Sequence, residues 1–265
     1  MIRITGSFLV SAAFLGAQAP QSATEPPPQA SFGLQDATII QRLTETKPAI
    51  GKGGAAPRLA DGKPDLSGPW EPNAIRENVN LAAAGVQIPF RPEAKAIYDQ
   101  RLATLGKDDP EARCLPPGVP RLTTTPYPFR FLQVPGLIVI IYEGGSQTFR
   151  QIFVDGRKHS KFAEDLWNGE SVGHWEDDTL VVETVGFNEK TWIDAAGVPH
   201  SKDMKVTERI RLLDAENMEI VSTVDDARMY AKPWSFTTYP KRLHGEILEY
   251  ICNENEADAR HLVGK

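Results

Sequence analysis

The sequence lacks a long apolar run and an excess of positive charge. Its longest apolar run, residues 6–16, is shorter than the about 20 residues that a transmembrane helix needs. The chain has 29 basic and 35 acidic side chains, a net charge of −6. Phosphate backbones and anionic lipid surfaces require clustered Lys and Arg, so neither is a predicted partner. No short metal-ligand spacing and no phosphate-binding loop occurs, so no metal and no cofactor are predicted.

The first 19 residues have the layout of a secretory signal peptide. Arg3 supplies the basic start, residues 6–16 form the apolar core, and residues 17–19 give a small-residue cleavage pattern. A buried apolar helix is the alternative. The sequence therefore predicts an exported protein, periplasmic or secreted, that does not insert in the membrane once the signal is removed. Loss of Arg3 shifts the net charge from −6 to −7.

The chain has only two cysteines, Cys114 and Cys252. In an oxidising compartment such a pair predicts a disulfide, with two buried free thiols as the alternative. The bond would close a loop of about 139 residues, for which chain entropy gives roughly 4–5 kcal/mol. Two thiolates alone are too few for a structural metal site.

Composition divides the mature chain into four parts. Residues 20–46 read as a disordered linker, because Pro and Gln dominate its start and leave little to bury. Residues 47–127 read as an extension of loops that carries one helix, from Pro92 to about Gly106, packed on the main domain. Residues 128–255 form the predicted β domain, and residues 256–265 a tail.

Short alternating segments separated by turn residues predict a mainly β fold. The predicted strands are 129–134, 137–143, 148–154, 171–175, 179–185, 205–213, 218–224, 234–239 and 247–252. Strands with short connections and no helices between them favour an antiparallel meander. Such a meander protects its edges by closing into a barrel or folding into two sheets. We expect a lipocalin-like β-barrel, with a sandwich as the alternative.

Alternation places three charged residues on apolar strand faces. Glu208 shares a face with Val206 and Ile210, and Arg150 shares one with Ile152. Glu143 continues the row of residues 137, 139 and 141. Buried charges either pair or change their pKa. One interpretation is an ion pair of Arg150 with Glu208 or Glu143 that fixes the register of the barrel. The other is a catalytic or binding pocket in which Arg150 holds negative charge.

Loop residues extend the list of candidates. His200 and His159 are the predicted general bases, because loops at a barrel mouth commonly carry function. Ser171 lies in a G-x-S-x-G pattern, which Asp194 and His200 follow in α/β-hydrolase order. The residues after Gly173 read as strand and turn instead of helix, so this match is interpreted as accidental. Trp167 and Trp192, in predicted loops, are candidate ligand contacts.

Several long segments resemble a family of exported bacterial proteins of unknown function. They read PRLADGKPDLSGPW, CLPPGVPR, VDGRKH, GESVGHWEDDTLVVETVGFNEKTWID, GVPHS, VTER and ICNEN, and span roughly residues 57–255. The resemblance implies export and points to no reaction. Its motifs contain His159, Ser171, Asp194, His200, Ser201 and Glu208.

The leading functional hypothesis is a polar pocket that acts on a small organic molecule. Elimination, isomerisation or hydrolysis would use His200 or His159 with Glu208, and Arg150 would bind negative charge. One alternative is a non-catalytic, lipocalin-like carrier of small ligands, which would have a deep and mostly apolar cavity. Another is a structural or partner-binding scaffold with a filled interior. No pattern specifies an oligomeric state.

Overall fold

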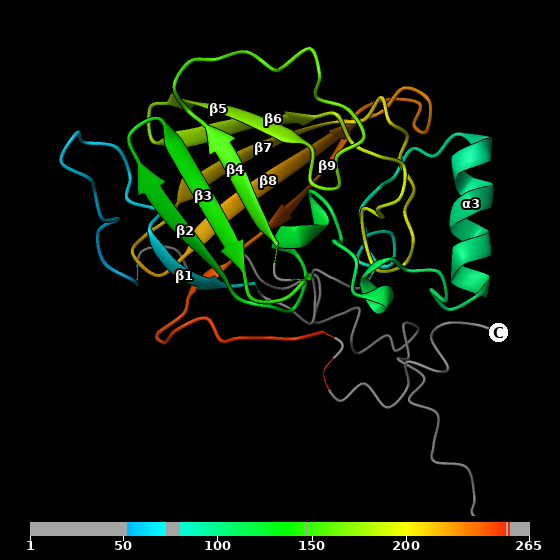
Figure 1. The fold of residues 1–265 in the computed structure, drawn as a ribbon, viewed down its shortest axis with the longest axis horizontal. Helices are drawn as coiled ribbons and strands as arrows, with labels where there is room; N and C mark the ends of the chain where they lie inside the picture. The colour runs from blue at the N-terminus through cyan, green and yellow to red at the C-terminus, as the bar shows by residue number, and fades with distance from the viewer. Residues whose placement is uncertain (1–51, 73–79, 147, 253, 255–265) are drawn as a thin grey trace, which may run out of the picture. The chain divides into compact units, whose positions relative to one another are not determined.

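The fold of this chain is known from a computed structural model that describes residues 52–72, 80–146, 148–252 and 254. The predicted signal peptide 1–19, the linker 20–46 and the tail 256–265 lie outside the described residues. The described chain is mainly β, with one α-helix and two short 3₁₀ turns (Figure 1). Its elements are β1 (Gly68–Glu71), α3 (Pro92–Ala103), η1 (Glu111–Arg113), η2 (Arg121–Thr123), β2 (Phe129–Val134), β3 (Leu137–Tyr142), β4 (Phe149–Phe153), β5 (Glu170–Glu176), β6 (Thr179–Val185), β7 (Lys205–Leu212), β8 (Met218–Asp225), β9 (Trp234–Thr238) and β10 (Lys241–Arg242).

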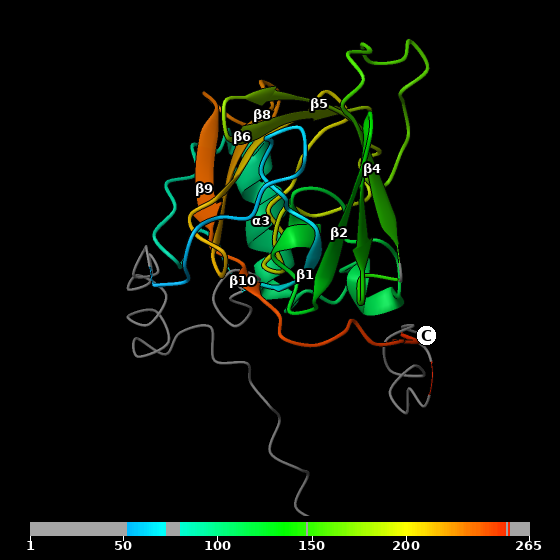
Figure 2. The ribbon, with the colours of Figure 1, turned by 90° about the vertical axis from the view of Figure 1, so that its left-hand side faces the viewer.

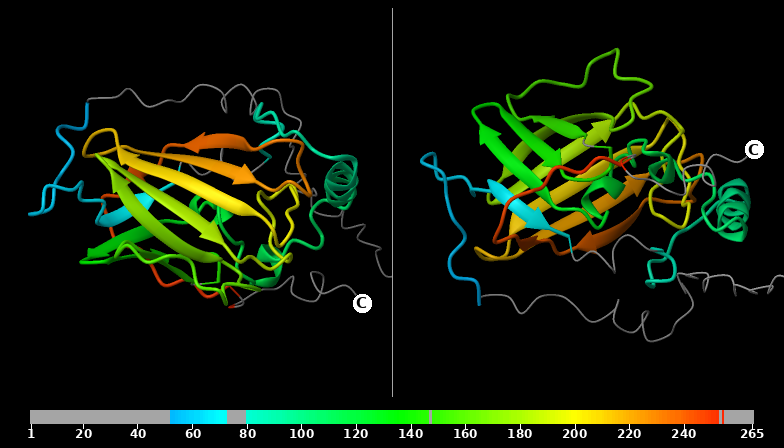
Figure 3. Two further views of the ribbon diagram at one scale, coloured as in Figure 1. Left: turned by 90° about the horizontal axis from the view of Figure 1, so that it is seen from above. Right: turned by 60° about the horizontal axis from the view of Figure 1, so that its bottom comes forward.

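The strands form one curled sheet in the order β10-β1-β2-β3-β4-β5-β6-β7-β8-β9. Figure 2 looks along the curl, with β9 on the left, β5 above, β2 and β4 on the right, and β1 and β10 below. β10 follows β9 after two residues and pairs with β1, so the chain from Trp234 to Arg242 connects the two ends of the sheet. The predicted curled, mainly β fold with one helix is confirmed, and the sheet has the form of a half-barrel (Figure 3).

One seam departs from the predicted meander. β4 and β5 are parallel, and they pair only at Ile152 with Ser171 and at Phe153 with Val172. The cause is the long connection from Val154 to Gly169, visible at the top of Figure 1, which returns the chain to the end of the sheet where β4 began. A two-residue hairpin joins only antiparallel strands, and a parallel pair needs such a crossover. The expectation of antiparallel pairing throughout was wrong at this position.

The concave side of the sheet holds the core. Alternate residues of each strand point inward, so β2 contributes Phe129 and Phe131, and β3 contributes Ile138 and Ile140, all of them buried. On β3 the sequence placed the opposite row inward, and that assignment was wrong. Residues 137, 139 and 141 are only partly buried, and the strand ends at Tyr142, so Glu143 does not continue an inward row. Both rows of β3 are apolar, and alternation therefore carries no signal about its faces.

The helix α3 packs against loops at one end of the sheet. It begins at Pro92 in its first turn and buries Ala94 and Tyr98. The Nη1 of Arg101 donates to the carbonyl of Gly197 at 3.0 Å, and its guanidinium lies 4.6 Å from the centre of the Trp192 ring. The helix therefore rests on the 188–200 loop, as Figure 1 shows at the right-hand end.

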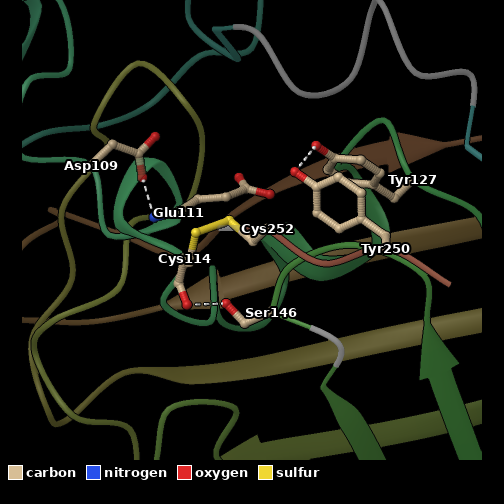
Figure 4. Close-up of a disulfide and its surroundings, with 7 residues drawn as sticks. All are labelled: Asp109, Glu111, Cys114, Tyr127, Ser146, Tyr250 and Cys252. Atoms are coloured by element: carbon tan, nitrogen blue, oxygen red, sulfur yellow. Dashed lines mark hydrogen bonds between the residues drawn. A yellow bond between two sulfur atoms is a disulfide. The ribbon is translucent and has the colours of Figure 1, made fainter. Parts of the chain in front are cut away.

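The predicted strand 247–252 does not form, although the chain there is anchored at every second residue. Glu246 pairs with Arg130, the backbone N–H of Leu248 donates to Glu143 Oε2 at 2.7 Å, and Tyr250 packs on Tyr127 with ring centres 4.9 Å apart. Cys252 forms the predicted disulfide with Cys114, across a Cα–Cα distance of 5.7 Å (Figure 4). The alternating apolar pattern of residues 247–252 thus corresponds to a segment that side-chain contacts hold in place, without the backbone hydrogen bonds of a strand.

Candidate functional site

Six successive strands each place one polar side chain on the inner face of the sheet. The residues of this belt are Tyr142 of β3, Arg150 of β4, Ser171 of β5, Thr184 of β6, Glu208 of β7 and Ser222 of β8. All six are buried. Register brings them together, because Ser171 faces Thr184 and Glu208 faces Ser222 across neighbouring strands. The belt therefore forms one polar level within an otherwise apolar interior.

Arg150 is the centre of the belt. Its Nε donates to Ser171 Oγ at 2.9 Å, and its Nη2 donates to Thr184 Oγ1 at 2.8 Å and to Glu208 Oε2 at 2.5 Å. Burial lowers the pKa of Arg150, but the neighbouring Glu208 carboxylate outweighs burial, so the pKa is raised overall. The guanidinium therefore stays charged, and the predicted ion pair is the one with Glu208 and not with Glu143.

Four polar atoms of the belt have no hydrogen-bond partner among the described residues. They are Tyr142 Oη, Arg150 Nη1, Glu208 Oε1 and Ser222 Oγ. Burial raises the pKa of the Tyr142 phenol well above its usual range, although Arg150 acts in the opposite direction. The phenol therefore stays protonated. It lies close enough to Arg150 to interact electrostatically, without the geometry of a hydrogen bond. Buried polar groups usually have partners, and where the protein supplies none, ordered water, an ion or a ligand can supply them.

A surface depression of about 230 Å³ lies at the parallel seam between β4 and β5. Arg150 and Ser171 belong to its lining, but their side chains are 2% and 1% exposed and point to the inner face, so the depression opens on the outer face of the two strands. The rest of the lining is mixed, with Phe149, Phe153 and Leu166 apolar and Gln151, Asn168, Gly169 and Glu170 polar or small. Gly169 has a φ of +66°, and a Cβ there would lie 2.6 Å from Thr184 Cγ2. A side chain at this position would therefore crowd the belt itself.

The predicted catalytic histidine His200 lies in the loops near α3, and its hydrogen bonds are satisfied there. Its Nε2 is 2.7 Å from Thr191 Oγ1 and its Nδ1 is 3.1 Å from the carbonyl of Ser201, so the ring donates through Nδ1 and accepts at Nε2. Burial lowers the pKa of His200, so the ring is neutral. The contacts of His200 and those of Glu208 share no residue.

Asp194 and Ser201 also organise these loops. Asp194 accepts the backbone N–H groups of Leu81 at 2.9 Å and of Val198 at 3.0 Å, and burial raises its pKa. Ser201 donates through its backbone N–H and its Oγ to the two oxygens of Asp226, at 2.6 and 2.9 Å. These carboxylates therefore satisfy loop backbone. Asp194 and Ser171 lie in separate clusters, which supports the interpretation of the G-x-S-x-G match as accidental.

The other predicted residues are scattered. His159 lies on the outer side of the sheet, 3.1 Å from Glu170 and 3.4 Å from Glu183. Glu143 binds the C-terminal segment. Trp192 is buried under Arg101, and Trp167 is half-buried beside Lys190. Of the predicted set, Arg150, Ser171 and Glu208 come together in the belt, and His200 contacts the Ser201 carbonyl in the loops.

The sequence interpretation missed two groups of residues. Tyr142, Thr184 and Ser222 belong to the belt, and the signal was present, since Ser222 alternates with Ile220 and Val224. The second group surrounds Arg121, which is buried and forms a bidentate pair with Asp109 at 2.7 and 2.8 Å. Its Nη2 also lies 2.7 Å from Glu111. That group lies in loops and turns, where no periodic pattern could reveal it.

In the part of the chain that the structure describes, no group of three or more His, Cys, Asp or Glu side chains is arranged to hold a metal ion. In the same residues no helix is long and apolar enough to span a bilayer. No model of a known protein family, no curated protein and no solved structure matches the chain. The resemblance to a family of exported bacterial proteins therefore stays a prediction.

Proposed function

We propose that this protein is an exported binding protein for a small organic molecule. The molecule is held on the inner face of the sheet by the polar belt around Arg150 and Glu208. The observation that carries the proposal is the convergence of four buried polar atoms without partners on one level of the interior. A guest that bonds to them supplies the missing partners.

Energetics favours a binding role over a purely structural one. Each buried polar group without a partner costs about 1–3 kcal/mol. A buried ion pair is often no more stabilising than well-packed apolar side chains of similar volume. A belt that served stability alone would therefore have satisfied hydrogen bonds, or none to satisfy. Retention of several unsatisfied atoms on one inner face is what a site completed by a bound molecule would have.

Two features support export. The leader-like residues 1–19 precede the domain, and Cys114 and Cys252 form a disulfide. Disulfides persist in oxidising compartments and are rare in the cytosol. The protein therefore works in the periplasm or outside the cell.

Acid–base chemistry on the bound molecule is the second candidate function. Glu208 Oε1 has no donor, which leaves it available to accept a proton, and the protonated Tyr142 phenol is available to donate one. The pair would act on one guest from β7 and β3, which the curl of the sheet brings close enough for Glu208 to affect the pKa of Tyr142. His200 has no part in this version, because both of its ring nitrogens are already engaged.

Native mass spectrometry of the mature protein, purified from an oxidising compartment, tests the binding function. The test variant is Tyr142→Phe with Ser222→Ala, which removes two hydroxyls without changing the charge. The matched control is Thr223→Val, the outward-facing neighbour of Ser222 on the same strand. We expect a co-purified small molecule on the wild type and the control, and its loss from the test variant.

The same preparations are then titrated with small aromatic fragments and followed by amide NMR. A wild type without a guest, and without any fragment-induced shift at residues 168–171, overturns the binding function and favours a scaffold. Chemical conversion of the guest by the wild type, lost in Glu208→Gln, identifies the enzyme instead.

A further inference from the structure

The outer face of β2, β3 and β4 presents an apolar surface to solvent. Every second residue of these strands points outward, and each of those side chains is half-buried or exposed. Pairing places Leu132 beside Val139, and Val139 beside Gln151, so the outward side chains form continuous rows across the strands. The outward set is Arg130, Leu132, Val134, Leu137, Val139, Ile141, Phe149, Gln151 and Phe153. Only Arg130 and Gln151 in it are polar, so this face forms an apolar patch.

The outer face of β5, β6 and β7 is charged instead. Glu176 pairs there with Arg209 at 2.8 Å, and Glu183 with Lys205 at 3.4 Å. Ion pairs of this kind suit a face that stays in water, whereas an exposed apolar patch with a polar surround commonly marks an interaction site. The patch on β2, β3 and β4 is therefore the part of the outer surface that is suited to contact another molecule.

The patch is too small for a stable contact with a second protein. Strands about 4.8 Å apart and residues about 3.4 Å apart along β4 give it roughly 14 Å by 17 Å. This area of about 240 Å² is well below the about 800 Å² per partner of a stable protein interface. The depression beside Phe149 holds about 230 Å³, below the roughly 300–1,000 Å³ of sites for drug-sized ligands. The occupant is therefore a slender molecule that places one ring in the depression.

Phe149 offers a flat surface to that ring. Its side chain is 59% exposed, and among the described residues no aromatic ring or cation packs on it. Phe153, further along the same row, is already covered by the guanidinium of Arg157, 3.8 Å from its ring centre. The negative face of an aromatic ring attracts the weakly positive C–H groups of a neighbouring ring. Phe149 is therefore the platform of the depression.

Polar groups beside Phe149 exclude a purely apolar occupant. Gln151 lies between the two Phe residues of β4, and its exposed amide has no hydrogen-bond partner among the described residues. Glu170 Oε2 accepts the backbone N–H of Ser160 at 2.8 Å, which leaves Oε1 for another donor. An apolar guest would remove both groups from water without replacing their hydrogen bonds, which is unfavourable. Hydroxyl groups both donate and accept, so they satisfy an amide and a carboxylate equally well.

The charges at this face select against an ionic occupant. Arg130 pairs with Glu246, and Arg157 pairs with Asp155 at 2.6 Å, so each guanidinium at the face has a counterion within the chain. Glu170 adds a carboxylate at the depression, which repels anions. A cationic occupant would have to compete with the basic partners that these carboxylates already have. An uncharged molecule with hydroxyl groups meets neither difficulty.

From these features we infer a second site on the outer face that binds a neutral glycan chain. One sugar ring lies in the depression against Phe149, and its hydroxyls bond to Gln151 and to Glu170 Oε1. A pyranose ring has an apolar C–H face and a rim of hydroxyls, which is the combination that this surface requires. The inference goes beyond the proposed function and does not depend on it, because the belt lies on the opposite face of the sheet.

Neutral and charged tetrasaccharides test the ligand class. The neutral probes are cellotetraose, maltotetraose and the tetramer of N-acetylglucosamine. The controls are the deacetylated, cationic form of that tetramer, anionic tetragalacturonate, and a capped tetrapeptide of alanine. Each is titrated into the mature, disulfide-bonded protein and followed by amide NMR at residues 149–153 and 166–170. We expect at least one neutral tetramer to shift these amides and to bind about tenfold more tightly than every control.

Matched variants test the place of binding. Phe149→Ala should weaken the neutral tetramer about tenfold, and Gln151→Leu about fivefold, because each removes one kind of contact. Phe162→Ala is the control for the first change, since Phe162 is 85% exposed and does not line the depression. It should keep the wild-type affinity. The belt variant Tyr142→Phe with Ser222→Ala should keep it as well.

The outcomes decide between this site and its alternatives. No shift with any neutral tetramer overturns the glycan site and leaves the belt proposal untouched. A preference for the tetrapeptide or for a charged tetramer overturns the ligand class. Unchanged affinity in Phe149→Ala contradicts the platform, and unchanged affinity in Gln151→Leu contradicts the hydroxyl contacts. Loss of binding in the belt variant alone would place the sugar on the inner face and overturn the second site.

Discussion

At the scale of single residues, the charge state of the buried side chains distinguishes the belt around Arg150 from the loop residues around His200. Arg150 and Glu208 are both charged and almost fully buried, and each compensates the other at 2.5 Å. His200 is equally buried but neutral, since burial lowers its pKa. The first arrangement leaves Arg150 Nη1 and Glu208 Oε1 without hydrogen-bond partners among the described residues, whereas the second uses a neutral histidine to link Thr191 and Ser201.

The neutral state of His200 predicts acid sensitivity. Its folded-state pKa lies below the usual 6.5, so between these two values the unfolded chain binds a proton that the folded chain does not. This contribution to stability is complete above pH about 6.5 and decreases as the pH falls towards the folded pKa, by at most about 1.4 kcal/mol per pH unit. Urea unfolding of the wild type and His200→Asn from pH 7.5 to 5 measures it.

We expect the wild type to lose stability towards pH 5 more steeply than His200→Asn. The variant loses its bond to Thr191 at every pH, so only the slope is informative. Asp194, whose pKa is raised by burial, acts in the opposite direction in both proteins and cancels in the comparison. Equal slopes in wild type and His200→Asn would contradict the assignment of a neutral, buried ring.

At the scale of elements, alternation in the sequence predicted most strands and placed Arg150 and Glu208 on the correct faces. Glu208 lies between inward apolar residues and outward polar ones, so its period-2 signal is strong. On β4 the inward row holds Arg150 and Ile152, although Phe149 on the outward row is apolar and exposed. The prediction failed on β3, where both faces are apolar. It also failed at residues 247–252, where alternate residues hold an extended segment without a partner strand. Alternation reports side-chain environment and not backbone pairing.

The parallel pairing of β4 with β5 should open locally more easily than the long antiparallel pairings of the sheet. With only two residue pairs between β4 and β5, its amides should open locally more readily than those between β7 and β8, which share eight pairs. Hydrogen exchange of the mature protein measures this directly. We expect the seam amides of β4 to exchange at least tenfold faster than amides at the centre of β7. Equal protection in both places would mean that the sheet opens only as a whole.

At the scale of the whole molecule, the belt follows from topology that no single strand reveals. Arg150 and Glu208 lie 58 positions apart in the sequence, and their contact depends on the order and register of all the strands between them. The crossover before β5 and the continuation of β9 into β10 set that curl. A sequence pattern predicts which side chains point inward, whereas the curvature that brings them together depends on long-range packing.

The disulfide is the long-range constraint on this architecture. It joins Cys114, just after η1, to Cys252, at a sequence separation of 138 (Figure 4). A bond that closes so long a loop restricts the unfolded chain and stabilises the folded one by roughly 4–5 kcal/mol. For a domain of this size that corresponds to roughly 10–20 °C in Tm. Thermal unfolding of the oxidised wild type and of Cys114→Ala with Cys252→Ala should differ by this amount.

The addition of a reductant separates loop closure from local packing. Reduced wild type should unfold close to the temperature of the double variant, and the variant itself should not respond to reductant. Tyr127→Phe removes the hydroxyl that faces Tyr250 but keeps the bond, so it should lower Tm by far less. If a thiol assay shows full reduction while the wild-type Tm stays unchanged, then the contacts at Glu246, Leu248 and Tyr250 hold the segment without help. The entropic account of the disulfide would then be wrong for this fold.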